Sequence, residues 1–181
     1  MEHWGVYGVG VAKTTDEPRW LTPKEQRTWR GLVGLILELQ GEQEAALVGG
    51  HGITEGEYGV LVYLSEAPDR RLRMCDLAQE LRLSPSGLTR RIDGLTKLGF
   101  VTREPSREDR RAMLAVLTDD GMAKLIAAAP THVRAVRASL IDHLSPQDLR
   151  ALGDIVERAR ESRDREGYAR IQRGSATSST V

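Results

Sequence analysis

Hydrophobic positions between residues 72 and 98 predict two short helices joined by a tight turn. The first helix has its apolar side supplied by Leu77, Ala78, Leu81 and Leu83. The second begins at Ser84-Pro85, an N-cap serine followed by proline at the first helical position, and it ends before Gly99. Its apolar residues recur at intervals of three and four and predict one buried stripe, made of Leu88, Ile92, Leu95 and Leu98. Two helices in this order are typical of a helix-turn-helix.

The second helix is polar away from that stripe. Its leading residues are small, hydroxylic or basic, namely Ser84, Ser86, Gly87, Thr89 and Arg90. The first residues of a recognition helix contact base edges in the major groove of DNA. We therefore expect these five residues to contact DNA.

Two β-prone runs follow, at residues 100–103 and 113–117, and they enclose a charged turn. The arginines of this turn repel one another unless something negative lies opposite, and a narrow minor groove attracts inserted arginine. We expect a DNA-binding wing made of Arg107, Asp109, Arg110 and Arg111. Arg111 is the expected tip, oriented by the Asp109 carboxylate, and Arg110 is the competing tip residue. Arg103 either contacts DNA or holds the wing by internal hydrogen bonds.

Helix starts are also marked outside this unit. Capping boxes stand at Thr22–Glu25, Thr54–Glu57 and Ser145–Asp148, and Thr118 is placed to cap a long helix. The first helix is expected to end near Val48, at a glycine-rich break over residues 49–52. One winged-helix unit does not need three further amphipathic helices, so residues 22–48, 119–143 and 146–163 either fold back on the core or cover a second chain.

Several of these segments together resemble the MarR family of winged helix-turn-helix regulators. The resemblance rests on the run Leu83-Ser84-Pro85-Ser86-Gly87-Leu88-Thr89-Arg90, on Asp109-Arg110-Arg111, and on Leu117-Thr118-Asp119-Asp120-Gly121. With the flanking helices it covers roughly residues 22–163. It implies an obligate homodimer that binds a pseudo-palindromic operator in double-stranded DNA, most often as a repressor.

The expected fold is mainly α with a small β-wing, a winged helix-turn-helix DNA-binding lobe plus a helical dimerisation region. Residues 1–19 are expected to form an N-terminal arm, either flexible or packed on the dimer, and residues 164–181 a disordered tail. Residues 20–163 are expected to form a single MarR-like domain. Within it, we expect residues 54–118 to form the DNA-binding lobe, and residues 22–48 and 119–163 to form the dimerisation helices.

Charge and composition fit a DNA-binding protein. The chain has no net charge, yet residues 70–111 hold eleven Arg and Lys against six Asp and Glu, a local charge of +5. No apolar stretch approaches the roughly 20 residues needed to cross a bilayer, and no secretory signal is evident, so we expect a cytoplasmic protein without a membrane partner. No cofactor loop or catalytic motif is present, which predicts a protein that is not an enzyme and needs no cofactor.

Regulation by a ligand is implied by the family resemblance. It suggests a pocket for a small aromatic or phenolic effector, for which Trp29, His51, Tyr58 and Tyr63 are candidate lining residues. Aromatic residues at helical spacing more often belong to a core, which is the alternative interpretation of these four.

Two further sensing mechanisms and one other function stay open. The single cysteine, Cys75, is either a redox sensor or a small buried hydrophobe. One cysteine does not supply the several thiolates of a thiol zinc site. The four histidines are His3, His51, His132 and His143, and they lack the tight spacing of a metal site. A metal-sensing or redox-sensing regulator, and a winged-helix protein-interaction module, are the alternatives.

Overall fold

The computed structural model describes residues 18–106, 109 and 112–176 of the chain. The chain divides into two compact units, Met1–Leu37 and Glu38–Val181, and the boundary falls within the first helix. Of the expected N-terminal arm, residues 1–17 lie outside the described part.

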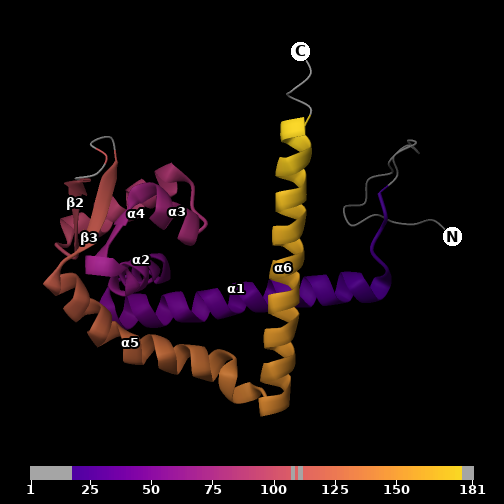
Figure 1. Ribbon diagram of the computed structural model, residues 1–181. Coiled ribbons are helices and arrows are strands. Elements are labelled where there is room, and N and C mark those ends of the chain that lie inside the picture. Colours follow the sequence, from indigo (N-terminus) through magenta and orange to yellow (C-terminus); the bar gives the residue numbers. More distant parts are fainter. Residues whose placement is uncertain (1–17, 107–108, 110–111, 177–181) are drawn as a thin grey trace, which may run out of the picture. The chain divides into compact units, whose positions relative to one another are not determined.

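The described residues form a mainly helical chain with one small sheet (Figure 1). The helices are α1 (Pro23–His51), α2 (Glu55–Glu66), α3 (Met74–Glu80), α4 (Pro85–Lys97), α5 (Asp119–Ser139) and α6 (Pro146–Ala176), with short 3-10 helices η1 (Pro68–Arg70) and η2 (Ile141–His143). The strands are β1 (Arg71–Arg73), β2 (Val101–Pro105) and β3 (Met113–Leu117). The expected fold class, mainly α with a small β-wing, is confirmed.

Local hydrogen bonds start the helices where the sequence predicts. At α2, the Glu57 amide donates to Thr54 Oγ1 at 3.1 Å and the Thr54 amide donates to Glu57 Oε2 at 2.8 Å. At α6, the Asp148 amide donates to Ser145 Oγ at 3.2 Å. Thr118 Oγ1 likewise accepts from the Gly121 amide at the start of α5. Each bond satisfies an amide that has no partner within the first turn of its helix.

Two helix ends differ from the expectation. Helix α1 runs past Val48 to His51, and the chain turns at Gly52, whose φ of 66° suits glycine. A glycine inside a helix costs only about 1 kcal/mol, so Gly49 and Gly50 do not break it. The tail expected to be disordered from residue 164 is helical to Ala176. Residues 164–173 are mostly good helix formers, and the Gly, Ser and Thr composition begins only at Gly174. Residues 177–181 lie outside the described part.

The sheet has β3 at its centre, antiparallel to β1 on one side and to β2 on the other. The β2–β3 hairpin was predicted, with Val101 opposite Leu117 and Pro105 opposite Met113. Strand β1 was not predicted, because a run of three residues carries no usable alternation. Its backbone pairs with β3, which lies some forty residues further along the chain.

One apolar core joins α2, α3, α4 and the sheet in the second unit. Within α4, Leu88, Ile92 and Leu95 are fully buried, as predicted. The fourth residue of the expected stripe, Leu98, is 51% exposed, and this part of the prediction is wrong. Leu98 is the C-cap residue of α4, the last position before the chain turns away at Gly99 with a φ of 79°, and it lies beyond the buried part of the stripe.

We expect Gly121→Ala to destabilise this fold. Gly121 is buried in the first turn of α5, and a Cβ added there would collide with the Phe100 carbonyl oxygen and lie 2.7 Å from Leu117 Cδ1. Since a backbone oxygen cannot rotate away, the substitution should lower the free energy of unfolding by about 1–3 kcal/mol.

Denaturant unfolding measures this loss, with Gly59→Ala as the matched control. At Gly59 the new methyl group would meet Leu81 Cδ2 at an ordinary 3.5 Å. Equal stability of the two variants would show that the approach of α5 to Phe100 is not constrained.

Candidate nucleic-acid interface

Helices α3 and α4 form the predicted helix-turn-helix. Leu77 and Ala78 of α3 are buried, and Leu81 and Leu83 of the connection are partly buried against the same core. The connection turns at Arg82, which has a φ of 53°, and it is closed by a hydrogen bond from the Leu83 amide to the Ala78 carbonyl oxygen at 2.9 Å. The core contacts of α3 and of the turn thereby orient α4.

The residues expected to contact DNA lie together at the start of α4. Ser84, Ser86, Thr89 and Arg90 are exposed and Gly87 is partly exposed. Ser84 is also the N-cap, because its Oγ accepts from the Gly87 amide at 3.1 Å. Thr89 Oγ1 donates to the Pro85 carbonyl oxygen at 2.8 Å, and this exposed hydroxyl oxygen keeps its lone pairs for a donor.

The wing is described only in part. Asp109 is exposed, and its amide donates to Oγ of the buried Ser106 at 3.4 Å. The Ser106 amide donates to the Ala112 carbonyl oxygen at 2.9 Å, which closes the base of the turn. Arg107, Arg110 and Arg111 lie outside the described residues, so the expected orientation of Arg111 by Asp109 stays a prediction.

Arg103 connects the wing to the recognition helix. Its Nη2 donates to Asp93 Oδ1 at 2.7 Å and to the Thr89 carbonyl oxygen at 3.3 Å, so β2 is attached to the middle of α4. The sequence left two roles open for Arg103, contact with DNA and internal hydrogen bonding. The structure contains the internal hydrogen bonds. Because both side chains are partly exposed, the ion pair contributes less than about 1 kcal/mol to stability. Its main effect is on the relative orientation of wing and helix.

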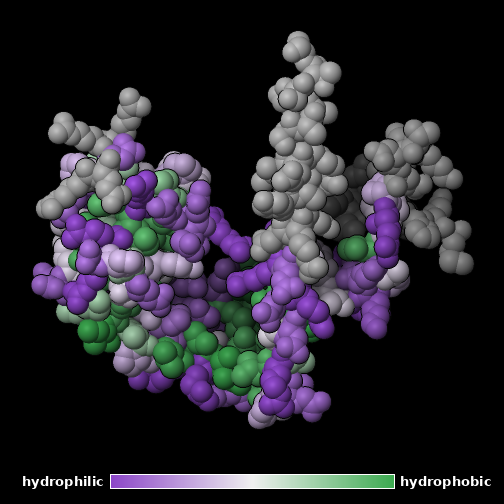
Figure 2. Space-filling model, in the orientation of Figure 1, coloured by the Kyte–Doolittle hydropathy of each residue, from purple (hydrophilic) through white to green (hydrophobic). Residues whose placement is uncertain are grey.

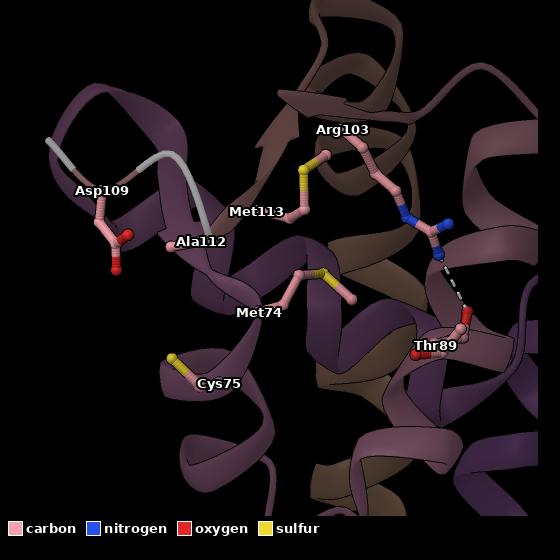
Figure 3. Close-up of a pocket in the computed structure, with 7 residues that line it drawn as sticks. All are labelled: Met74, Cys75, Thr89, Arg103, Asp109, Ala112 and Met113. Carbon is pink, nitrogen blue, oxygen red and sulfur yellow. Dashed lines mark hydrogen bonds between the residues drawn. The ribbon is translucent and has the colours of Figure 1, made fainter. Parts of the chain in front are cut away.

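A cavity of about 600 Å³ lies between α3, α4 and the wing. Figure 3 shows Arg103 and Thr89 on one side of it, Cys75 and Asp109 on the other, and the side chains of Met74 and Met113 between them. Cys75 is exposed in the first turn of α3, with Sγ 3.2 Å from Asp76 Oδ1. The prediction that Cys75 is a small buried hydrophobe is therefore wrong. Redox sensing by Cys75 stays a hypothesis.

Two of the candidate effector residues contact neighbouring positions of α5. His51 Nε2 lies 2.9 Å from Thr131 Oγ1, and the Tyr58 ring stacks on His132 with centroids 4.5 Å apart. Tyr58 is only 8% exposed and belongs to the core, where burial raises the pKa of its hydroxyl. Tyr63 packs partly buried against the same core. Trp29 is exposed in the first unit, and its relation to the other three residues stays a prediction.

Large apolar side chains lie exposed outside the helix-turn-helix. In the second unit they gather where α5 gives way to α6, around a cavity of about 550 Å³ (Figure 2) whose apolar lining is Leu140, Ile141, Leu149, Leu152 and Val156. In the first unit the exposed ones are Trp20, Leu21, Trp29, Leu32, Leu35, Ile36 and Leu37. Exposed apolar surface of this extent marks an interaction site.

Neither a metal centre nor a membrane span is found in the described part of the chain. No group of three or more His, Cys, Asp and Glu residues there could hold a metal ion. No described helix is both long enough and apolar enough to cross a bilayer.

Comparison with known proteins identifies the family. A sequence model of the MarR family matches residues 51–112. A MarR family transcriptional regulator of Streptomyces coelicolor, solved as a crystal structure in complex with DNA, is 39% identical with a TM-score of 0.76, over 80% of this chain and 91% of that one. The chain belongs to the MarR family. It is therefore a winged-helix transcriptional regulator, and the prediction that it is not an enzyme is confirmed by this membership.

Two other proteins are similar to this chain. AbsC, a MarR family transcriptional regulator of S. coelicolor, is 37% identical with a TM-score of 0.75, over 80% of this chain and 97% of AbsC. The HTH-type transcriptional repressor YetL of Bacillus subtilis is 34% identical over 112 residues, which cover 60% of this chain and 67% of YetL.

The stacked pair of Tyr58 and His132 should make this MarR-family protein sensitive to acid. Burial lowers the pKa of His132 below its usual 6.5, so the folded protein binds this proton less tightly than the unfolded chain does. The associated stability is fully present above pH 6.5 and is lost as the pH falls through 6.5 towards the lowered pKa. His132→Phe keeps a stacked ring and should lose less stability between pH 7 and pH 5.

Thermal unfolding at both pH values measures the difference, with His143→Phe, at an exposed position of η2, as control. If the His132→Phe variant lost as much stability in acid as the wild type, His132 would not be the cause of the acid sensitivity.

Proposed function

We propose that the chain binds double-stranded DNA sequence-specifically as a homodimer, with the start of α4 in the major groove. One observation carries the proposal. Leu88, Ile92 and Leu95 are buried along one side of α4, while Arg90 and Thr89 are exposed on another. A helix so anchored presents hydroxyl and guanidinium groups outward on a rigid support, as direct readout of bases requires.

The wing completes this proposed interface. Arg107, Arg110 and Arg111 follow β2 in the sequence, and β2 is attached to the recognition helix through Arg103. We assign Arg111 to the minor groove, with Asp109 as its orienting carboxylate and Arg110 as the competing tip residue. The S. coelicolor relative that was crystallised with DNA supports the same use of the fold.

Loss of the Arg90 guanidinium should weaken operator binding. The side chain is exposed, and it makes no hydrogen bond or ion pair with a described residue, so its donors are available to a phosphate or a guanine edge. Arg90→Ala should cost about 1–3 kcal/mol of binding free energy and, if the contact is to a phosphate, reduce the salt slope by about one.

The measurement is a salt titration of binding to an operator selected from random duplex DNA. Arg150→Ala, at an exposed position of α6, is the control and should bind as the wild type does. Binding through several phosphates must weaken steeply as the salt concentration rises. A wild-type protein whose affinity for duplex DNA does not depend on salt would favour the interaction-module alternative.

The homodimer is supported by the apolar surface around the start of α6. Leu149 is 41% exposed and Val156 is 45% exposed, and both line the cavity beside η2. A second copy of the chain would cover this surface, and two-fold symmetry would then set the two recognition helices about 34 Å apart, one turn of the duplex.

We expect Leu149→Asp with Val156→Asp to weaken the dimer, because both changes place a charge in the proposed interface. Sedimentation at micromolar concentration should show a dimer for the wild type and an increased monomer fraction for the double variant. A wild-type protein that sediments as a monomer under these conditions would contradict the dimer.

Repression and response to a ligand belong to the same proposal. YetL is named a transcriptional repressor, and its similarity to this chain favours that role. A small aromatic or phenolic effector would reduce DNA affinity by preferring a dimer whose recognition helices are wrongly spaced. Since the operator is chromosomal DNA, we place this activity in the cytoplasm.

A further inference from the structure

The guanidinium group of Arg91, on α4, lies flat against the start of α2. A Cβ built on Gly56, the second residue of α2, would lie 2.5 Å from Arg91 Cζ, 2.7 Å from Nε and 2.8 Å from Nη2. Three atoms of one planar group at nearly equal distances mean that the plane covers the glycine. Any side chain at position 56 would occupy the space of the guanidinium, so a larger residue there would displace the end of the Arg91 side chain.

A second close approach lies one turn further along α4. A Cβ built on Gly94 would be 3.1 Å from Glu57 Oε1, while the other carboxylate oxygen of Glu57 accepts the Thr54 amide of the capping box at 2.8 Å. The two helices therefore meet at two points, and at each point a glycine of one helix receives a long side chain of the other. Such paired contacts define the position of α4 along α2.

Two carboxyl groups stand next to the Arg91 contact. The Glu55 amide donates to Glu44 Oε2 at 2.6 Å, which brings the end of α1 to the same place. Burial, and then the Glu44 charge, raise the pKa of Glu55, while the Arg91 charge opposes that rise. Arg91 is partly buried and has no hydrogen bond or ion pair within 4 Å to a described residue. The positive charge of Arg91 therefore interacts with the Glu55 carboxyl group at a distance of more than 4 Å.

We propose that Arg91 is a positioning residue, which holds the rear of the recognition helix against Gly56 at the start of α2 and makes no contact with DNA. This inference rests on the proposed DNA-binding function. It assigns different roles to two adjacent arginines. Arg90 faces outward and contacts the duplex, whereas Arg91 faces α2 and sets where Arg90 stands.

The test begins with Gly56→Ala, which displaces the guanidinium without removing it. The arginine is flexible and the core contacts of α4 remain, so the fold should persist, but α4 loses the contact of Arg91 with the start of α2. Operator affinity should fall roughly threefold to tenfold, within the range of coupling between residues in contact. Gly59→Ala in the same helix is the matched control, because it brings the same gain in helix propensity and only an ordinary contact at 3.5 Å.

Salt dependence separates positioning from phosphate contact. Arg91→Ala should lower operator affinity with an unchanged salt slope, whereas a phosphate contact of Arg90 would lose about one unit of slope on substitution. The double variant Gly56→Ala with Arg91→Ala should bind as Arg91→Ala alone does, because the group that the new methyl would displace is already absent. Thermal unfolding and sedimentation of each variant check that fold and assembly are retained.

Each possible result has a distinct meaning. Equal operator affinity of Gly56→Ala and Gly59→Ala, or a reduced salt slope for Arg91→Ala, overturns the assignment while leaving DNA binding intact. Additive losses in the double variant also overturn it, since independent sites add. If the wild type binds no duplex, the proposed function itself fails, and the assignment fails with it.

Discussion

The side of α4 that carries Leu88, Ile92 and Leu95 is buried in a core shared with α2 and the sheet, and this contact orients the helix. With three residues fixed at intervals of four and three, the rotation of the helix about its own axis is determined. The exposed positions of Ser86, Thr89 and Arg90 are a consequence of that burial. Arg103 then transmits the same orientation to β2, because it bonds both Asp93 and the Thr89 carbonyl oxygen. Helix and wing are thus presented as one surface.

Close packing at glycines connects this surface to the rest of the second unit. Gly121 allows α5 to start directly beside the Phe100 carbonyl group, and Gly56 allows α2 to receive Arg91. Lys124 on α5 adds a third connection: its Nζ donates to the His51 carbonyl oxygen at 3.0 Å and stands 5.4 Å from the centre of the Phe100 ring. The last turn of α1, the start of β2 and α5 therefore meet at one side chain. A displacement of α5 would act on the base of the wing through these contacts.

Features that depend on residues three or four apart were predicted from the sequence. The capping boxes and the buried stripe of α4 are of this kind, because their partners are neighbours along one helix. Strand β1 was missed because three residues carry no usable alternation, and only pairing with β3 makes them a strand. The role of Arg103 was left open because its partner, Asp93, lies on another element. Arg91 was missed although a signal existed: it stands three residues after Leu88 and four before Leu95, at the edge of the buried stripe.

The internal use of arginines also changes the meaning of the local positive charge. Of the eleven basic residues at positions 70–111, Arg70 pairs with Asp119, Arg71 with Glu104 and Arg103 with Asp93. Glu104 and Asp93 are already subtracted in the local charge of +5, whereas Asp119 lies outside these residues. The Arg70–Asp119 pair and the contact of Arg91 with α2 therefore leave less positive charge for DNA than +5 indicates. Non-specific affinity grows with the number of phosphates that a protein neutralises, whereas discrimination depends on the few groups that reach base edges. This chain has no net charge and holds a small number of outward arginines on rigid elements. That arrangement limits non-specific affinity without weakening the discrimination between DNA sequences. Sequence preference then follows from where Arg90 and the wing are held, and much less from how basic the lobe is.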